Sequence, residues 1–308
     1  MNLRSRTFGG KSRVATSVWK RLGNVENYIE PFFGSGSVLM MRPSIHKLRH
    51  ETVNDIDAWL VNFWRSVRED PNAVAEHANW PVSELDLHAR GDFIFHRKGV
   101  EKWVDKFRAD PTYYNAKLAG WWVWGCCCRI GSWCPNPSGD KLSRSRPKVV
   151  RVGVVRYSMS KDRILHFIER ISRRLRNVTI LCGSWDRTCT SYSATTFQGV
   201  TGVFLDPPYG NEDRVETYAH DDFTVAADVR KWCLENGDNK MMRIALCGYE
   251  GEGHEELVKA GWAMKKWKAT GGYGNQRKDG DNKNARRERI WFSPHCLNSK
   301  TGFGILTS

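Results

Sequence analysis

One segment near the N-terminus constrains the fold more than any other. A strand-like run, Tyr28-Ile29-Glu30, leads into the loop Pro31-Phe32-Phe33-Gly34-Ser35-Gly36-Ser37, and an apolar helical segment begins at Val38. In parallel α/β sheets, a glycine-rich turn between a strand and a helix lets the backbone approach a ligand closely at the carboxyl edge of the sheet. This order of strand, turn and helix therefore predicts the first unit of an α/β fold, with a binding site beside Gly34 and Gly36.

Apolar runs with strand character alternate with helical patterns along much of the remaining chain. Strands are expected at residues 52–54, 178–181, 202–205 and 243–247, helices at residues 12–22, 59–67, 164–175 and 225–232, and a final strand pair at residues 262–268 and 289–292. Strands separated by helices are typical of a parallel sheet with helices on both faces. We therefore predict an α/β fold that ends in an antiparallel hairpin.

The alternation fades between residues 71 and 159, where aromatic, glycine, cysteine and basic residues predominate. The most apolar stretch of the chain, residues 118–128, lies in this segment and is too short to span a membrane, so we interpret it as buried core. We predict that residues 71–159 form an inserted module with a basic surface. Residues 1–70 and 160–308 would then form the α/β domain together.

The chain carries 48 Lys and Arg against 34 Asp and Glu, which gives a formal net charge of +14. This surplus favours a polyanionic partner, and 14 Trp and 13 Phe offer rings that can stack on unpaired bases, so nucleic acid is the favoured partner. A general bias toward solubility is the alternative. The polar N-terminus lacks the apolar core of a signal peptide, so the nine cysteines are interpreted as reduced intracellular thiols. They include no CxxC pair, which disfavours a zinc site.

A carboxylate is predicted at the same edge of the sheet as the glycine-rich loop. Asp55 follows the second strand, where a carboxylate can accept hydrogen bonds from ribose hydroxyls. A helix N-cap is the structural alternative for both Asp55 and Asp57. Position 39 is Leu, so the third glycine of a dinucleotide fingerprint is missing. A nucleoside cofactor without a pyrophosphate is therefore favoured over NAD.

The tetrapeptide Asp206-Pro207-Pro208-Tyr209 follows an apolar strand and is the strongest chemical signal in the sequence. Its two prolines remove backbone donors and stiffen the turn, which leaves a carboxylate, carbonyl oxygens and one aromatic ring. A planar base with an exocyclic amine suits this set, because acceptors engage the amine while the ring stacks on the base. The tetrapeptide therefore predicts chemistry on the amine of a nucleobase.

Four ordered motifs of this chain resemble those of the Dam-like (D12 class) adenine-N6 DNA methyltransferases. They are Phe8-Gly9-Gly10-Lys11, Glu30-Pro31-Phe32-Phe33-Gly34-Ser35-Gly36-Ser37-Val38, Asn54-Asp55-Ile56-Asp57 and Asp206-Pro207-Pro208-Tyr209. The likeness covers residues 7–70 and 163–292 and leaves the insertion unmatched. It implies a Rossmann-like, S-adenosylmethionine-dependent methyltransferase sheet with helices on both faces. The catalytic domain would be residues 1–70 and 160–308, and residues 71–159 would be an inserted target-recognition module that binds DNA.

The resemblance also implies roles for individual residues. The catalytic residues would be Asp206, Pro207, Pro208 and Tyr209. Asp206 and the Pro207 carbonyl would bind the adenine amino group, and Tyr209 would stack on the extruded base. The cofactor-binding residues would be Thr7, Phe8, Lys11, Pro31, Phe32, Gly34, Gly36, Asp55, Ile56 and Asp206. Many relatives have an aromatic residue at the position of Thr7, and Phe8 is the nearest substitute.

Asp186 is a further candidate, taken from its own sequence context. It follows the strand at residues 178–181 in the run Cys182-Gly183-Ser184-Trp185-Asp186, where a carboxylate could border the cofactor adenine. A plain turn residue is the alternative interpretation of Asp186.

Direct methyl transfer agrees with these residue types. The lone pair of adenine N6 is delocalised into the ring, so the amine is a poor nucleophile until acceptors hold it in a more pyramidal geometry. A positive methylsulfonium then needs only in-line positioning, which is proximity and electrostatic catalysis. Methylation at cytosine C5 would require a cysteine nucleophile, and Cys134-Pro135 has the reverse of the usual order.

Basic residues outside these motifs are the candidate DNA contacts. Flipping a base out of a duplex costs roughly a few kcal/mol, which phosphate contacts can offset. The candidates are Arg144, Arg146, Lys148 and Arg151 in the insertion and Arg277, Lys278, Lys283, Arg286 and Arg287 in a late loop. A solvated loop is the alternative interpretation of each run.

The sequence thus predicts an adenine-N6 DNA methyltransferase that uses S-adenosylmethionine and no metal. DNA is the predicted partner, no membrane is involved, and a companion restriction endonuclease is a candidate partner. The predicted location is the cytoplasm of a bacterium, or of a bacterial host if a phage encodes the chain. An N4-cytosine DNA methyltransferase, an RNA methyltransferase and a catalytically inactive DNA-binding protein of the same fold stay open as alternatives.

Overall fold

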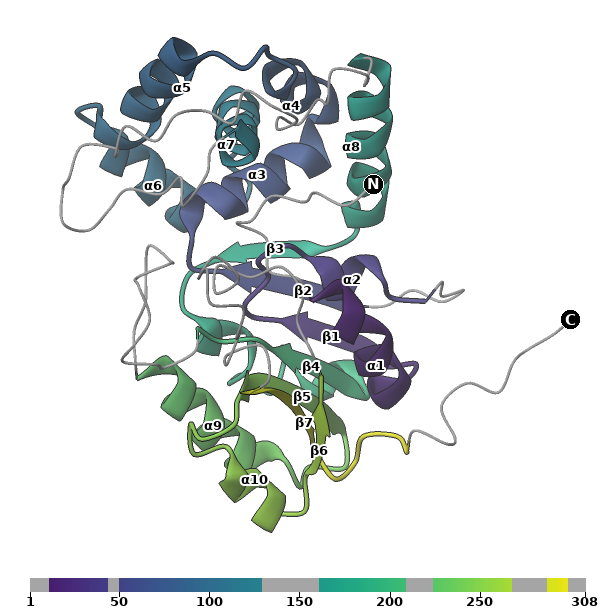
Figure 1. Cartoon of the computed structure of the whole chain (residues 1–308). Helices are drawn as coiled ribbons and strands as arrows, with labels where there is room; N and C mark the ends of the chain where they lie inside the picture. The colour runs from purple at the N-terminus through teal and green to yellow at the C-terminus, as the bar shows by residue number, and fades with distance from the viewer. Residues whose placement is uncertain (1–10, 44–49, 129–160, 209–223, 268–286, 299–308) are drawn as a thin grey trace, which may run out of the picture. The chain divides into compact units, whose positions relative to one another are not determined.

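The structure, a computed structural model, describes residues 11–43, 50–128, 161–208, 224–267 and 287–298 (Figure 1). These residues pack into two compact units. The helical unit contains the described residues between Asp55 and Ser184, and the sheet unit contains those within Gly9–Asn54, Trp185–Arg214 and Asp221–Ser308. The division of the chain into a catalytic domain and a target-recognition module at residues 71–159 stays a prediction.

A mixed sheet of seven strands runs through the described residues in the order β3-β2-β1-β4-β5-β7-β6. The strands are β1 (Asn27–Glu30), β2 (His50–Asp55), β3 (Thr179–Cys182), β4 (Thr201–Leu205), β5 (Met242–Tyr249), β6 (Ala263–Lys266) and β7 (Glu288–Phe292). β1 is parallel to β2 and β4, and β4 is parallel to β5, whereas β7 is antiparallel to both β5 and β6. The predicted strands, the final antiparallel pair and the Rossmann-like α/β architecture are therefore confirmed.

Helices cover both faces of the strands in the sheet unit (Figure 1). On one face, Val203 of β4 and Leu246 of β5 join a buried cluster that includes Trp232 of α9 (Val225–Asn236) and a residue of α10 (Glu255–Lys259). On the other face, the ring of Trp19 in α1 (Ser12–Leu22) lies 4.7 Å from the ring of Tyr28 in β1. The alternation of side chains along each strand thus supplies two apolar surfaces, one for each helical layer.

α1 illustrates how the sequence determines an element and its end. Val14, Val18 and Leu22 recur at helical spacing, and all three are buried. The helix ends before Gly23, whose φ of 68° lies in the left-handed region that glycine adopts without steric cost. A Cβ at this position would also collide with Leu297. The predicted helix and its glycine stop are confirmed.

Six α-helices and β3 make up most of the described helical unit. The helices are α3 (Ala58–Glu69), α4 (Pro71–Ala78), α5 (Glu84–Gly91), α6 (Val100–Ala109), α7 (Ala116–Cys128) and α8 (Lys161–Leu175). α7 packs against α3 and α4, and α8 packs against the same two helices. Pro71 follows the end of α3, as expected, and opens α4, because proline suits the first turn of a helix. The carboxylate of Asp70 caps α4 by accepting from the Ala73 amide at 3.1 Å.

α7 lies where the sequence predicted no regular element, only buried core. Nearly all of its residues from Leu118 to Cys128 are buried, including Trp122 and Trp124. A helix that is apolar all round has no polar face, so its sequence lacks the period of an amphipathic helix. The prediction of buried core is confirmed, and the helical conformation is the part that the pattern did not reveal.

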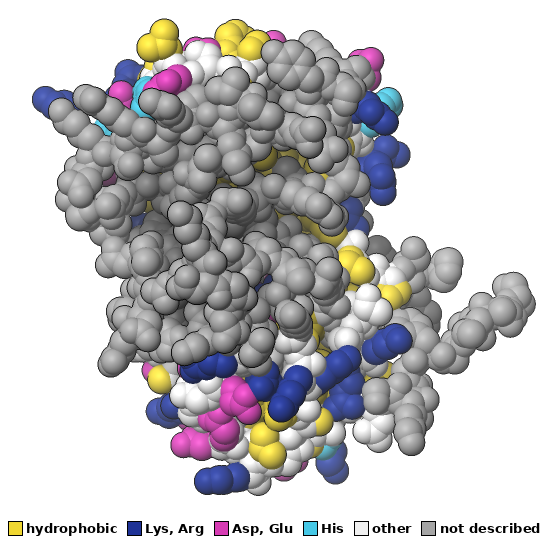
Figure 2. Space-filling model, in the orientation of Figure 1, with side chains coloured by type: hydrophobic (Ala, Val, Ile, Leu, Met, Phe, Trp, Pro, Cys, Tyr) yellow, Lys and Arg dark blue, Asp and Glu magenta, His cyan; other side chains and the backbone are white. Residues whose placement is uncertain are grey.

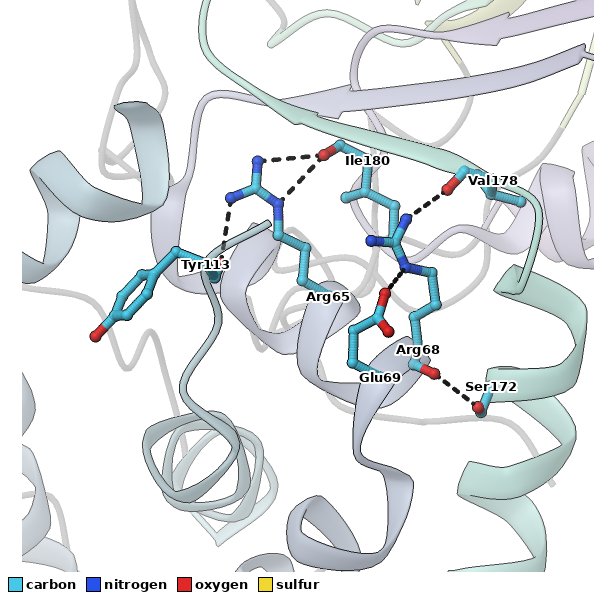
Figure 3. Close-up of polar contacts among 7 residues, drawn as sticks. All are labelled: Arg65, Arg68, Glu69, Tyr113, Ser172, Val178 and Ile180. Atoms are coloured by element: carbon cyan, nitrogen blue, oxygen red, sulfur yellow. Dashed lines mark hydrogen bonds and ion pairs between the residues drawn. The ribbon is translucent and has the colours of Figure 1, made fainter. Parts of the chain in front are cut away.

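Two arginines of α3 tie the helix to β3 (Figure 3), and one of them also reaches the end of α6. The Arg65 guanidinium donates to the Ile180 carbonyl through both Nε and Nη2, at 3.2 Å each, and to the Phe107 carbonyl at 2.7 Å. Arg68 donates to the Val178 carbonyl at 2.8 Å. Backbone carbonyls at a helix end and beside a strand thus receive donors from α3.

Charged side chains of both signs gather over α9, α10 and β6 on the face seen in Figure 2.

Most of the basic candidates from the sequence, in residues 144–151 and 277–286, lie outside the described residues. Within the part of the chain that is described, no helix is both long and apolar enough to cross a membrane.

Candidate functional site

The loop at residues 31–37 is fixed against the end of β2 by backbone and amide contacts. The Phe33 amide donates to the Asn54 carbonyl at 2.9 Å, and the Asn54 side chain donates to the Pro31 carbonyl at 3.1 Å. The Gly36 amide closes a turn on the Phe33 carbonyl at 2.8 Å. Since β1 and β2 are parallel, the loop and the end of β2 lie at the same carboxyl edge of the sheet.

Gly34 and Gly36 have different reasons to be glycine. Gly36 precedes α2 (Ser37–Met40) with a φ of 63°, and a Cβ there would lie 2.7 Å from the ring of Phe33. Gly34 has a φ of 46°, and a Cβ there would meet nothing within 4 Å. Gly36 is therefore required by the turn itself, whereas the backbone at Gly34 faces open space that a ligand can approach.

Replacing Gly36 with alanine is expected to weaken binding of the predicted cofactor, S-adenosylmethionine. A left-handed backbone costs an L-residue about 1–2 kcal/mol, and the new methyl group would also push Phe33 out of the loop. Gly99→Ala is a matched control, since Gly99 has a φ of 89° but open space around its Cβ position. Calorimetric titration should show weaker binding for Gly36→Ala alone. Equal cofactor affinity in the two variants would contradict this role of the loop.

Asp57 and Asp55 divide the two roles that the sequence left open. One oxygen of Asp57 accepts from the amides of Trp59 and Leu60, at 2.9 and 3.3 Å, so Asp57 is the N-cap of α3. Asp55 ends β2, and its Oδ1 accepts from the Asp57 amide at 3.0 Å. Ile56 between them is 44% exposed, which is unusual for an isoleucine beside a strand end. The structure thus presents an oriented carboxylate next to an exposed apolar side chain.

A row of aromatic rings in the sheet unit begins at Phe32 of the loop at residues 31–37. The half-buried Phe32 ring stacks on Trp185 with centroids 6.2 Å apart, and Trp185 meets Trp232 of α9 edge to face. Asp186 lies in the 3₁₀ turn Trp185–Thr188, and its side chain is exposed. The turn carbonyl of Asp186 accepts from the Cys189 amide at 3.0 Å. The sequence did not indicate Trp185 as a site residue, although it stands next to Asp186.

The two ends of the proposed motif set meet in one ion pair. Asp206, which directly follows β4, accepts from the Lys11 ammonium, with Nζ 2.9 Å from Oδ1. Lys11 is the N-cap residue of α1, so the first helix of the chain and the strand before Pro207 share this contact. The two side chains are 12% and 21% exposed, which places the pair mostly out of water. One carboxylate oxygen of Asp206 is therefore paired with a cationic side chain, that of Lys11.

The surroundings of Lys11 keep it charged. Burial lowers the pKa of Lys11, but the negative charges of Asp206 and Glu288 and the hydrogen bond to Asp206 more than reverse this and raise the pKa above its ordinary value. The ammonium also lies 4.8 Å from the centroid of the Trp267 ring, at cation-π distance. A lysine held in this way is a fixed positive charge rather than a proton donor.

Glu288 and Trp267 belong to this neighbourhood, and the sequence analysis did not identify either of them. Glu288 is the first residue of β7, where every residue is buried. The signal that could have revealed it is a carboxylate near the start of a strand whose last three residues, 290–292, are apolar. Trp267 directly follows β6, so its place near Lys11 depends on the antiparallel pairing of β6 with β7. Neither contact follows from local sequence.

Several site candidates lie outside the described residues. They are Thr7, Phe8, Tyr209, Arg144, Arg146, Lys148, Arg151, Arg277, Lys278, Lys283 and Arg286. Arg287 is described, and its guanidinium donates to the Glu250 carbonyl through Nε and Nη2, at 3.1 and 2.9 Å. It also lies over the ring of Tyr249, 5.6 Å from the centroid. A DNA contact by Arg287 stays a prediction and would have to share these donors.

Comparison with known proteins identifies the family of the chain. The model of a family described as D12 class N6 adenine-specific DNA methyltransferase matches residues 8–232. A similar protein is the Type II methyltransferase M.MjaIII of Methanocaldococcus jannaschii, 25% identical over 212 residues. The matched region covers 65% of this chain and 66% of the relative, a little under two thirds of the length of that curated relative.

Proposed function

Because this chain belongs to the D12 class N6 adenine-specific DNA methyltransferase family, we propose that it transfers a methyl group from S-adenosylmethionine to the N6 amine of a flipped-out adenine in DNA. The family acts on DNA, and its reaction requires a methyl donor. The observation that carries the proposal is the half-buried carboxylate of Asp206, which directly precedes Pro207 and Pro208 and is paired with Lys11.

S-adenosylmethionine is the proposed donor because the donor set fits a nucleoside cofactor without phosphates. In the sheet unit, the backbone at Gly34, where a Cβ would meet nothing within 4 Å, the half-buried ring of Phe32 and the carboxylate of Asp186 would hold it. The resemblance also assigns Asp55 and Ile56, which begin the helical unit, to the nucleoside. No cluster of basic side chains for a pyrophosphate is seen among the described loop residues 31–37. When bound, this cofactor supplies an electrophilic methyl group on a positively charged sulfur.

The residues of the chain then act on the amine. Asp206 and the Pro207 carbonyl would each accept a hydrogen bond from an N–H of the amine and so turn the nitrogen lone pair toward the methyl group. Proline at positions 207 and 208 contributes no backbone donor that would compete for these acceptors. The low exposure of Asp206 strengthens its hydrogen bonds relative to bulk water. The chemistry is positioning and electrostatic stabilisation, without a covalent enzyme intermediate.

The test is transfer of a labelled methyl group to DNA, followed by mapping of the modified base. We expect N6-methyladenine at a defined sequence. Label at cytosine N4 would replace the adenine assignment, label in RNA alone would replace DNA as substrate, and cofactor-independent DNA binding without any transfer would support an inactive DNA-binding protein. A companion restriction endonuclease and a bacterial or phage origin stay predictions from the resemblance.

Salt is expected to separate DNA binding from cofactor binding. We propose that the basic residues of the insertion at residues 71–159 and of the late loop contact phosphates, whereas the cofactor meets the carboxylates of the sheet edge. Each phosphate contact releases counterions, so DNA affinity should fall by at least about tenfold between 50 and 200 mM salt. Cofactor affinity, measured by calorimetry at the same salt concentrations, should stay nearly constant. A parallel fall of both affinities would contradict this division.

A further inference from the structure

Two carboxylates and one thiol, at or near the ends of three strands, surround the ammonium of Lys11. Asp206 follows β4, and its neighbour in the register of β4 with β5 is Cys247, since Leu205 pairs with Leu246. Cys247 pairs in turn with Ile290 of β7, and Glu288 lies two residues before Ile290 in that strand, on the same face. Burial and the nearby carboxylates raise the pKa of the Cys247 thiol well above its ordinary value, so it stays neutral. Asp206 and Glu288 are therefore the charged partners available to the lysine.

Glu288 has a buried oxygen without a hydrogen-bond partner. The residue is only 8% exposed, and its Oε2 is fully buried and receives no donor from the described residues. A buried acceptor of this kind is costly, because it gave up water and gained nothing in return. The main-chain carbonyl of Glu288 accepts from the Trp267 amide at 3.4 Å, and the Trp267 ring lies against Lys11. Glu288 Oε2 therefore belongs to β7, the strand that is hydrogen-bonded to Trp267 beside Lys11.

We propose that Glu288 is a positioning residue that takes up the Lys11 ammonium when the target amine engages Asp206. This inference rests on the proposed function. In the structure, the Lys11 ammonium is paired with Asp206 Oδ1. An incoming target amine needs the same carboxylate as its hydrogen-bond acceptor. A second carboxylate nearby lets the lysine shift without losing its counter-charge, and the shift gives Glu288 Oε2 a donor. Asp206 is then available to the amine while Lys11 stays charged and buried.

The charges around Glu288 support this exchange. Burial raises the pKa of Glu288 to about 7, with the negative charge of Asp206 adding to the rise and the positive charge of Lys11 opposing it. The other charged or titratable neighbours are Cys247 on β5, Arg289 on β7, whose guanidinium donates to the Glu288 carbonyl, and Glu250, which pairs with Arg289. Glu288 can therefore accept the lysine as a charged partner above neutral pH and only poorly below it.

The first arm of the test compares wild type with Glu288→Gln in single-turnover methyl transfer. Glutamine keeps the size of the side chain but cannot carry the counter-charge. We expect the wild-type rate to rise with pH through about 7, and the variant to be slower by roughly ten- to a hundredfold and to lack this rise, since bonds to charged groups are the strong ones. DNA affinity should be unchanged, because Glu288 is buried.

The second arm needs no methyl transfer. A carboxyl whose pKa is raised on folding favours the folded state at low pH, and this contribution is lost as pH rises from the unfolded value near 4.5 to about 7. The Glu288→Gln variant has no carboxyl at this position, so it does not lose stability in this way. The melting temperature of the variant minus that of wild type should therefore increase from pH 5 to pH 8. Glu235→Gln, an exposed substitution on α9, should show no such trend.

The two arms together distinguish the possible failures. A variant that is more stable than wild type at pH 8, yet slower and without the pH-dependent rise, supports the proposal. A variant that matches the wild-type rate and pH profile, or that is less stable at every pH and keeps the rise, overturns it. If Glu288→Gln does not fold, Glu288→Asp should keep the rise at a reduced rate, and an unchanged rate would equally overturn the proposal. An inactive wild type would instead refute the proposed function.

Discussion

Replacing Asp206 with alanine is expected to reduce methyl transfer by about a hundred- to a thousandfold, the order of magnitude seen when a preorganised polar contact to the reacting group is removed. The variant loses the carboxylate that would hold the amine. It also leaves the Lys11 ammonium beside the place where positive charge develops on the nitrogen, because the ion pair at 2.9 Å is gone. Both changes disfavour the transition state. Single-turnover measurement with saturating labelled cofactor isolates this step from binding.

Asparagine at position 206 is the informative companion. It keeps one carbonyl oxygen for the amine but has no charge for Lys11, so we expect a rate between those of alanine and wild type. Glu235→Ala, on the exposed side of α9, controls for a general effect of removing a carboxylate. DNA binding should survive in all three variants. Transfer by Asp206→Ala within about tenfold of wild type would remove Asp206 from the catalytic role, since one lost hydrogen bond alone accounts for such a factor.

The parts of the site that could be predicted from the sequence are those encoded locally. The strand ending at Glu30, the turn at Gly34 and Gly36 and the position of Asp206 after β4 follow from short patterns, because backbone geometry at these points depends on neighbouring residues. The pairing of Lys11 with Asp206 is different. It depends on how α1 packs against β4 and β5, and no local pattern contains that information.

The contrast between α7 and α8 explains why one helix was predicted and the other was not. α8 has one apolar face, with Ile164, Ile168 and Leu175 buried and charged residues between them, so its period is visible. α7 is enclosed by α3, α4 and α5 and needs no polar face. Where tertiary packing surrounds an element, its sequence indicates burial but not conformation.

Buried polar groups are the least predictable part of the structure. Arg65 and Glu288 are both nearly inaccessible, yet neither was identified from the sequence as important. An arginine in a helix and a glutamate at a strand end are ordinary surface residues by composition. What makes them special is the set of carbonyls or charges that distant segments bring to them. Such residues become visible only when the fold is known.

Replacing Arg65 with methionine is expected to destabilise the helical unit by about 3–5 kcal/mol, the range found when a buried network is broken. Arg65 is 1% exposed, and its donors reach the carbonyls of Ile180, Phe107 and Asp110, the last at 3.0 Å. Methionine fills much of the same volume without any donor. The carbonyls of α6 and β3 would therefore stay buried with fewer partners, and each such group costs about 1–3 kcal/mol.

Arg68→Met is the matched control, one turn further along α3. Arg68 donates to a single backbone carbonyl, that of Val178, and pairs with the adjacent Glu69 near the surface (Figure 3). Its loss should cost only about 1 kcal/mol, because water reaches this half-buried donor and can replace it. Chemical denaturation should therefore rank wild type, Arg68→Met and Arg65→Met in falling stability. Equal losses in the two variants would mean that proximity to β3, and not burial of the guanidinium, determines the contribution of these arginines.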